Sequence, residues 1–167
     1  RLHERYVCCE IYINLTGDVS FMVEDTLYPV SHGDAVITKP WEHHHCVYRS
    51  DRLHKHYWIL FSTENETLYP HFFDRIPGHR NLISLPSDQK EELIALCRSL
   101  LENKENDLNR YADFFAMQQL LAHGAAHSHG KTSALPKELA AMLEYAASAA
   151  PNELTAASLA ERGHVSI

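Results

Sequence analysis

The sequence predicts a mainly β fold followed by C-terminal helices, which is an α+β class. The first observation is size and balance: 167 residues, 45% hydrophobic and 22% charged, suit one globular domain plus part of a second. The second is that short apolar segments alternate with turn residues as far as Pro86, which is typical of antiparallel strands. The third is that apolar residues then recur every three or four positions, which is typical of helices.

Six short strands are expected before Pro86. Residues 10–15 alternate between polar and apolar side chains, so one face of this strand carries Glu10, Tyr12 and Asn14. If this strand lay at a sheet edge, that polar face would simply be solvated. The other strands are expected at residues 19–23, 26–30, 35–38, 47–49 and 56–61. Strands this short and evenly spaced predict an antiparallel sandwich or barrel.

Two helices are expected directly after Pro86. The first has an apolar stripe that ends at Leu101, and Ser87 is placed to cap it. The second covers residues 108–121, and Gly124 begins to break it. Residues 128–135 are polar and small, so they predict a linker.

Two more helices are expected after the linker. One starts at Pro136, and the other is a short helix that Thr155 can cap. The inward side chains expected on the helix that follows Pro136 are Leu139, Met142, Leu143 and Ala146.

The net charge of −7 argues against a phosphate-binding surface, because nucleic-acid modules are usually basic. The 13 histidines are the unusual feature, since their full protonation would change the net charge from −7 to +6. Histidine titrates near pH 6.5. Either the surface charge is sensitive to mild acid, or some of these imidazoles hold a metal.

The four cysteines include no C-x-x-C pair, and adjacent Cys8 and Cys9 point to opposite faces of a strand. A reduced, cytoplasmic setting is therefore expected. No apolar run approaches the roughly 18 residues of a membrane helix, and no signal peptide opens the sequence, so no membrane partner is expected. Because it begins with Arg1 and ends without a helix cap, we interpret the sequence as an internal fragment of a longer protein.

A polar spacing near the N-terminus, His3-x-Arg5-x4-Glu10-x6-Gly17, resembles the first motif of the cupin family. In that motif two histidines, a glutamate and a glycine stand at these intervals. The resemblance implies a cupin-like antiparallel β-barrel, or jelly roll, whose interior side chains converge on one small ligand. Arg5 replaces the second histidine and cannot lose its proton to ligate a cation.

A second cupin-like spacing ends at a histidine. His44 follows Gly33 by eleven residues, which is the place of the last metal ligand in the second cupin motif, whereas counting from Pro40 selects His45. With Arg5 in the first motif, we expect no bound metal and no other cofactor. If a metal is present, the resemblance implies the ligands His3, Glu10, His44 and His45.

The order of segments forms a larger pattern. It consists of Glu10-Ile11-Tyr12-Ile13, then Tyr28-Pro29-Val30-x-x-Gly33-Asp34-Ala35-Val36-Ile37, then Pro40-x3-His44, then Tyr57-Trp58-Ile59-Leu60-Phe61. This order resembles the sensor domain of AraC-family transcription regulators, which place a cupin-like barrel first, then a helical dimerisation region, then two helix-turn-helix units. The tail Leu154-Thr155-x3-Leu159-Ala160-Glu161-Arg162-x-His164-Val165-Ser166 is similar to the opening of the first such unit.

The resemblance implies a ligand-sensing transcription regulator and no enzyme activity. Residues 1–85 would form the sensing barrel, 86–127 the dimerisation region, 128–135 the linker and 136–167 the truncated start of the helix-turn-helix DNA-binding domain. The implied partners are a small-molecule effector such as a sugar, a second copy in a homodimer, and DNA, read mostly by residues beyond Ile167. The implied ligand-binding residues are His3, Arg5, Glu10, Tyr12, His44 and Trp58.

Some interpretations remain open from the sequence. The dimer seam is expected at residues 87–101, although that stripe could equally pack against its own barrel. Of Tyr57 and Trp58, one is expected in the core and the other in the pocket. Consecutive strand residues alternate faces, so in the run from His43 to Cys46 only alternate side chains point together.

The alternative function is a metal-dependent cupin enzyme, such as a dioxygenase or a sugar isomerase. It would use His3, Glu10 and either His44 or His45. The helical tail after residue 136 has no role in a minimal enzyme of this kind. That tail, together with Arg5, favours the regulator.

Overall fold

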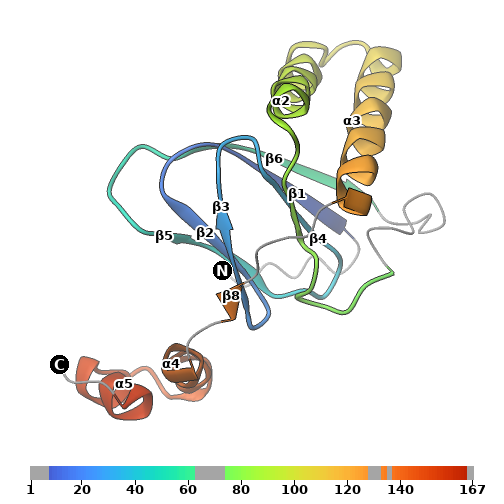
Figure 1. Cartoon of the computed structure of the whole chain (residues 1–167). Helices are drawn as coiled ribbons and strands as arrows, with labels where there is room; N and C mark the ends of the chain where they lie inside the picture. Colours follow the sequence, from blue (N-terminus) through green and yellow to red (C-terminus); the bar gives the residue numbers. More distant parts are fainter. Residues whose placement is uncertain (1–7, 63–73, 128–132, 135–136, 165–167) are drawn as a thin grey trace.

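The computed structural model of the chain describes residues 8–62, 74–127, 133–134 and 137–164. Within these residues, eight strands lie in the middle of the molecule, a pair of helices stands at one end, and a second pair lies at the opposite end (Figure 1). The predicted class, mainly β followed by helices, is confirmed. None of the described helices has the length and hydrophobicity needed to cross a lipid bilayer.

The strands form two antiparallel sheets of four strands each. Sheet A has the order β6 (Lys55–Ser62), β1 (Cys8–Thr16), β4 (Ala35–Thr38) and β7 (Leu82–Ile83). Sheet B has the order β5 (His44–Tyr48), β2 (Val19–Val23), β3 (Thr26–Val30) and β8 (Ser133–Ala134). No strand pairing between described residues joins the two sheets into a closed barrel, so the jelly roll stays a prediction.

The space between the sheets is filled by side chains from both of them. These buried residues are Tyr12, Phe21, Val23, Tyr28, Val30, Val36 and Leu82. The polar face predicted for the first strand points into this interior, where Glu10, Tyr12 and Asn14 are all buried. The solvated alternative is wrong, because β1 lies between β6 and β4 and is not an edge strand.

The opposite face of sheet A packs against helices α2 (Ser87–Glu102) and α3 (Asp107–His127). Ile11 and Ile13 of β1 share this cluster with Leu93 of α2 and Leu121 of α3, and all four side chains are fully buried. Burying each such side chain contributes about 1.5–3 kcal/mol. The alternation of β1 therefore directs apolar groups to the helices and polar groups to the interior.

The termini of these helices differ from the sequence-based expectation. The residue before α2 is Pro86, and Ser87 makes no side-chain capping hydrogen bond, so the expected cap is wrong. Gly124 does not break α3, which continues to His127. A Cβ atom at Gly124 would lie only 2.3 Å from Cδ2 of Leu85, so the glycine permits close packing of the helix on the segment before α2.

Helices α4 (Lys137–Ser148) and α5 (Ala156–Gly163) form a separate pair. The expected cap at Thr155 is confirmed: its side chain accepts from the main-chain nitrogen of Ser158, whose own hydroxyl accepts from the main-chain nitrogen of Thr155. Leu139 is 40% exposed rather than inward. Pro136 and the side chain of Leu143 lie outside the described residues.

Three strands were placed wrongly or missed. The expected strand at residues 47–49 is β5, which begins at His44. Strands β7 and β8 were not expected, because two residues are too few to show alternation. β8 lies in the predicted linker and pairs with Thr26 and Leu27 of β3, while residues 128–132 and 135 of that linker lie outside the described residues.

Candidate functional site

Three of the predicted ligand-binding residues meet between the sheets. Glu10 of β1 accepts through Oε2 from Nε1 of Trp58 on β6 at 3.0 Å, and the same oxygen lies 2.9 Å from Nε2 of His44 on β5. We call these residues the Glu10–His44–Trp58 cluster. His44 comes from sheet B and the other two come from sheet A, so the cluster bridges the sheets. The indole of Trp58 is 49% exposed, so the cluster is reachable from outside.

The two ring nitrogens of His44 both face oxygen atoms. Nδ1 donates to the main-chain oxygen of Glu42 at 2.8 Å, because a carbonyl can only accept. Nε2 faces the carboxylate of Glu10. Burial lowers the pKa of His44, but the hydrogen bonds and charges of Glu10 and Glu42 outweigh burial and raise the pKa above its ordinary value. His44 therefore keeps its second proton to a higher pH than a free imidazole does.

Aromatic rings extend the site along the interior. The ring of Phe21 stacks on that of His44, with centroids 5.8 Å apart and planes 16° apart. Tyr12 lies 5.0 Å from Phe21 and 4.9 Å from His56, centroid to centroid. Burial, followed by the proximity of Cys46, raises the pKa of Tyr12, so its hydroxyl stays neutral and donates to Oδ1 of Asn14 at 3.4 Å.

The structure therefore brings together Glu10, Tyr12, His44 and Trp58. His3 and Arg5 lie outside the described residues. His45 does not join the cluster, because it alternates with His44 along β5 and is exposed on the other face. Its pKa is lowered by burial and by the charge of His44.

Neighbouring aromatic residues on β6 take different sides. Tyr57 packs against the cluster of apolar residues under the helices, whereas Trp58 faces the interior. Among the residues that the structure describes, no group of three histidine, cysteine, aspartate or glutamate side chains is placed to hold a metal ion.

Several polar residues next to the site were missed from the sequence. Glu42 is buried and hydrogen bonded to Arg75 and Asn81, which belong to the segment before β7. No local pattern marks these residues, because the partners are separated by 33 and 39 positions in the chain. His56 is exposed, and its ring also stacks on that of Tyr12.

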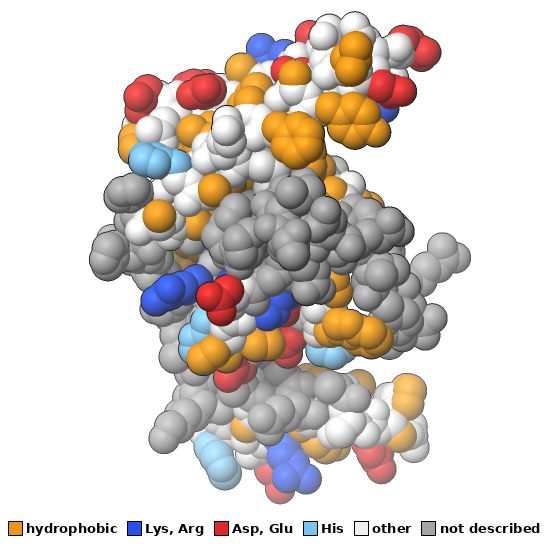
Figure 2. Space-filling view, turned by 90° about the vertical axis from the view of Figure 1, so that its right-hand side faces the viewer, with side chains coloured by type: hydrophobic (Ala, Val, Ile, Leu, Met, Phe, Trp, Pro, Cys, Tyr) orange, Lys and Arg blue, Asp and Glu red, His pale blue; other side chains and the backbone are white. Residues whose placement is uncertain are grey.

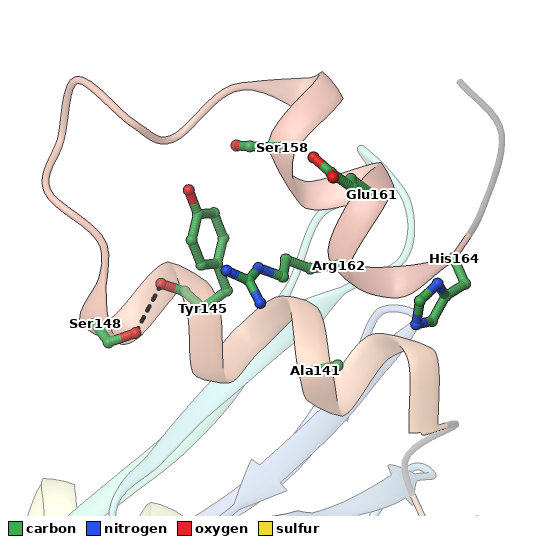
Figure 3. A pocket seen from close by; sticks show the side chains of 7 residues that line it. All are labelled: Ala141, Tyr145, Ser148, Ser158, Glu161, Arg162 and His164. Atoms are coloured by element: carbon green, nitrogen blue, oxygen red, sulfur yellow. Dashed lines mark hydrogen bonds between the residues drawn. The ribbon is translucent and has the colours of Figure 1, made fainter.

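Apart from the Glu10–His44–Trp58 cluster, a pocket of about 660 Å³ lies between α4 and α5 (Figure 3). Arg162 of α5 reaches across it, with its guanidinium 5.0 Å from the centroid of the Tyr145 ring. Gly163 lets α5 approach α4 closely, since a Cβ atom there would lie 2.1 Å from Cε of Met142. Arg162 and Gly163 therefore hold the helix pair together.

Apolar side chains are exposed at the end of the molecule formed by α2 and α3. Figure 2 shows hydrophobic groups gathered there, with acidic groups at the margin. Leu108 is 81% exposed, and Leu101, Tyr111 and Phe115 are each at least half exposed. Next to them a groove of about 440 Å³ runs between β6 and the two helices, lined in part by Phe61, Leu100 and Phe114.

The molecule is thus a two-sheet β protein with a polar cluster between the sheets, a helix pair on one outer face and a further helix pair. No family model matches the chain, and no curated protein matches it significantly. Among solved structures, the chain is similar to the crystal structure of the AraC-like transcriptional activator CuxR, with 9% sequence identity and a TM-score of 0.52. The likeness covers 96% of this chain but only 58% of that chain. The fold of this chain is therefore similar to that of part of this activator, and an identity of 9% supports a likeness of fold alone.

Proposed function

We propose that this chain is the ligand-sensing and dimerisation part of a cytoplasmic, DNA-binding transcription regulator, and that it is not an enzyme. The observation that carries the proposal is the fold likeness to a transcriptional activator over 96% of the chain. The order of parts supports it: a two-sheet domain, a helix pair packed on that domain, and a second helix pair connected through β8.

The Glu10–His44–Trp58 cluster is the proposed effector site, together with Tyr12 and with His3 and Arg5. Glu10 and His44 offer a shared proton and acceptor oxygens, and the half-exposed indole of Trp58 offers an aromatic face. A few polar groups set among aromatic rings are typical of sites for small polar metabolites. A sugar fits this chemistry, because its hydroxyls can donate and accept while its C–H face stacks on an indole.

Dimerisation is proposed through the exposed apolar face of α3. The stripe of α2 cannot serve this purpose as a whole, because Leu93 and Cys97 pack against the protein's own sheet A. The exposed residues Leu108, Tyr111 and Phe115 lie on α3 instead. Asp107 and Arg110 at its start carry opposite charges, so two copies related by a two-fold axis could exchange this pair across the seam.

The proposed mechanism needs the effector to distinguish two arrangements of the dimer. A ligand between the sheets contacts β1, whose other face supports α2 and α3. It would shift the dimer towards the arrangement that binds it more tightly, and a tenfold difference in affinity corresponds to about 1.4 kcal/mol. The DNA-binding domain that begins with α4 and α5 would then meet its two half-sites differently.

The experiment is a thermal-shift screen of the chain against a panel of monosaccharides, sugar acids and polyols. A binder at about 100 times its dissociation constant should stabilise the protein by about 2.7 kcal/mol. The variants Trp58→Phe and His44→Gln should lose most of this gain. A matched control is Leu53→Ala, since Leu53 is 72% exposed on the loop before β6 and outside the cluster.

The same preparations test the alternative of a metal-dependent enzyme. Elemental analysis that finds one equivalent of iron or zinc, lost in His44→Ala, together with no thermal shift from the panel, would reverse the ranking. Shifts without stoichiometric metal support the sensor.

A further inference from the structure

A buried ion pair lies directly behind the Glu10–His44–Trp58 cluster. Both carboxylate oxygens of Glu42 accept hydrogen bonds from the guanidinium of Arg75, the Oε2 contact being 2.7 Å long. The side chain of Glu42 is fully buried and that of Arg75 is 5% exposed. Removing two charges from water is costly, and the cost is offset only if the ions meet in close geometry and make further hydrogen bonds. The forked contact between the Arg75 guanidinium and the Glu42 carboxylate supplies the close geometry.

Further donors complete the surroundings of this carboxylate. The main-chain nitrogens of Lys39 and Gly78 donate to it at 2.8 and 2.9 Å, and the side-chain amide of Asn81 donates at 3.1 Å. Each carboxylate oxygen therefore receives at least two hydrogen bonds. Arg75 donates in addition to the main-chain oxygen of Ile37 at 3.1 Å, which ties the segment before β7 to the end of β4.

These bonds hold a tight turn in a strained form. The main-chain nitrogen of Glu42 donates to the main-chain oxygen of Lys39 at 3.2 Å, which closes the turn. Within it Trp41 has a φ of 72°, a conformation that favours glycine at this position of a turn. A strained residue persists only where its surroundings determine it strongly, and here the Glu42 carboxylate supplies those constraints.

The turn ends at the atom that orients His44. Nδ1 of His44 donates to the main-chain oxygen of Glu42 at 2.8 Å, and this bond leaves Nε2 aimed at Glu10. A histidine ring is fixed in one orientation and one protonation pattern by the partner of its other nitrogen. The path of contacts therefore runs from Arg75 through Glu42 to His44 and on to Glu10.

We infer that Arg75 and Glu42 are positioning residues for the Glu10–His44–Trp58 cluster. Arg75 clamps the Glu42 side chain, the clamped side chain fixes the turn at Trp41, and the carbonyl of Glu42 holds the His44 ring with its Nε2 towards Glu10. The inference rests on the proposed function, because it gives these residues a role at the proposed effector site. Both act through His44, whose Nδ1 donates to the main-chain oxygen of Glu42.

The test records the ring nitrogen resonances of His44 by NMR, without any ligand. The wild-type protein should show Nδ1 protonated in a single state. Arg75→Lys keeps the positive charge but loses the forked contact, and Arg75→Met loses both. We expect both variants to lower the melting temperature and to replace the single His44 state by exchange between protonation patterns. Unchanged His44 resonances in Arg75→Lys would overturn the inference.

The matched control is Lys90→Met. It breaks another largely buried ion pair, in which Nζ of Lys90 lies 2.7 Å from Oδ1 of Asp34, at the junction of the β3–β4 turn with α2. We expect it to lower the melting temperature without moving the His44 resonances. If Lys90→Met changes them as Arg75→Lys does, the effect is general loosening, and the positioning role is refuted.

A wild-type measurement decides the matter if neither Arg75 variant folds. The Nδ1 proton of His44 and the amide proton of Gly78 should be slowed by similar factors relative to their own intrinsic exchange rates, because the same opening of the Glu42 clamp would release both. A much smaller slowing factor at His44 overturns the inference. A sugar that binds in the screen adds a separate arm: its dissociation constant should rise at least tenfold in Arg75→Lys and stay unchanged in Lys90→Met. The NMR result stands even if no member of the panel binds, so the two proposals fail independently.

Discussion

Glu42 carries its negative charge where water is excluded. Burial raises the pKa of this carboxyl, but the hydrogen bonds and charge of Arg75, with the main-chain donors of Lys39 and Gly78, outweigh burial and leave the pKa below its ordinary value. A group whose pKa is lowered by folding stabilises the protein above its unfolded pKa. That contribution is lost as the pH falls through the folded pKa.

The prediction concerns Glu42→Gln, which keeps the shape but removes the charge and leaves Arg75 buried without a counterion. We expect a loss of about 3–5 kcal/mol in the free energy of unfolding at neutral pH. The difference from the wild type should hold down to about pH 5 and narrow below about pH 4.5, where the unfolded wild-type chain takes up its proton. Urea titrations between pH 7 and 3.5 measure it. A difference that does not change with pH would contradict the assignment of the charge.

Gln118 on α3 shows the opposite situation, a buried polar group without compensation. Its side chain is 4% exposed, and within the described part of the chain neither amide atom has a hydrogen-bond partner. An unsatisfied group of this kind costs about 1–3 kcal/mol. Gln118→Met has similar length and no polar end, so it should raise the free energy of unfolding by about 1–2 kcal/mol. Denaturant titration measures this gain. Gln119→Met is the control on the exposed neighbour and should change stability by less than about 0.5 kcal/mol.

Among the helices, α3 has two apolar faces with different uses. Met117 and Leu121 are fully buried against sheet A, whereas Leu108 and Tyr111 are exposed. The exposed face has no partner within the described residues of one copy, which is why we place the dimer seam there.

Tyr111→Glu should therefore weaken the proposed dimer, because it puts a charge at the centre of the proposed apolar seam. We expect the dimer dissociation constant, measured by analytical ultracentrifugation, to rise at least tenfold, which corresponds to about 1.4 kcal/mol. Leu53→Glu changes another exposed apolar residue, 72% exposed against 63% for Tyr111, and should leave the constant unchanged. A wild-type chain that is monomeric at all concentrations, or equal effects of both variants, would count against this seam.

The elements that could be predicted from the sequence are those whose information is local. The alternation of β1 put Glu10 and Tyr12 on one face of the strand, and the structure shows that this face is the interior one. The side chain of Thr155 caps α5 as expected. Ser87 was expected to cap α2 because serine is a common capping residue. In the structure the residue before the helix is Pro86, and no side chain forms the capping hydrogen bond. Gly124 failed as a breaker because its role is close packing against Leu85.

The site shows the same division. His44 and Trp58 were found from spacing and a strand pattern, but Glu42 and Arg75 were not, since their contact joins positions 33 residues apart. Pairing over such a distance depends on how β4, β5 and the segment before β7 meet in space. No periodic pattern in the sequence shows which of these segments are neighbours. Only the structure could therefore identify Glu42 and Arg75 as the residues that support His44.

At the scale of the whole molecule, the two helix pairs lie at opposite ends of the sheets (Figure 1). Sheet A carries α2 and α3 on its outer face, and β8, which precedes α4, is one of the two edge strands of sheet B. The Glu10–His44–Trp58 cluster bridges the two sheets. A ligand there would touch both the sheet that supports the proposed dimer seam and the sheet joined to the proposed DNA-binding unit. This arrangement explains how one small site could influence both ends.

The histidine content gives the molecule a charge that depends steeply on pH. With histidine neutral the net charge is −7, and with all 13 protonated it is +6, so the isoelectric point lies near 6.0. Most described histidines are exposed, and the raised pKa of His44 is offset by His45 and His56, whose pKa values burial lowers. We therefore expect the electrophoretic mobility of this 167-residue chain to change sign between pH 7 and pH 5.5, with zero mobility near pH 6. Zero mobility reached only below pH 5 would show that many of the imidazoles stay neutral in the fold.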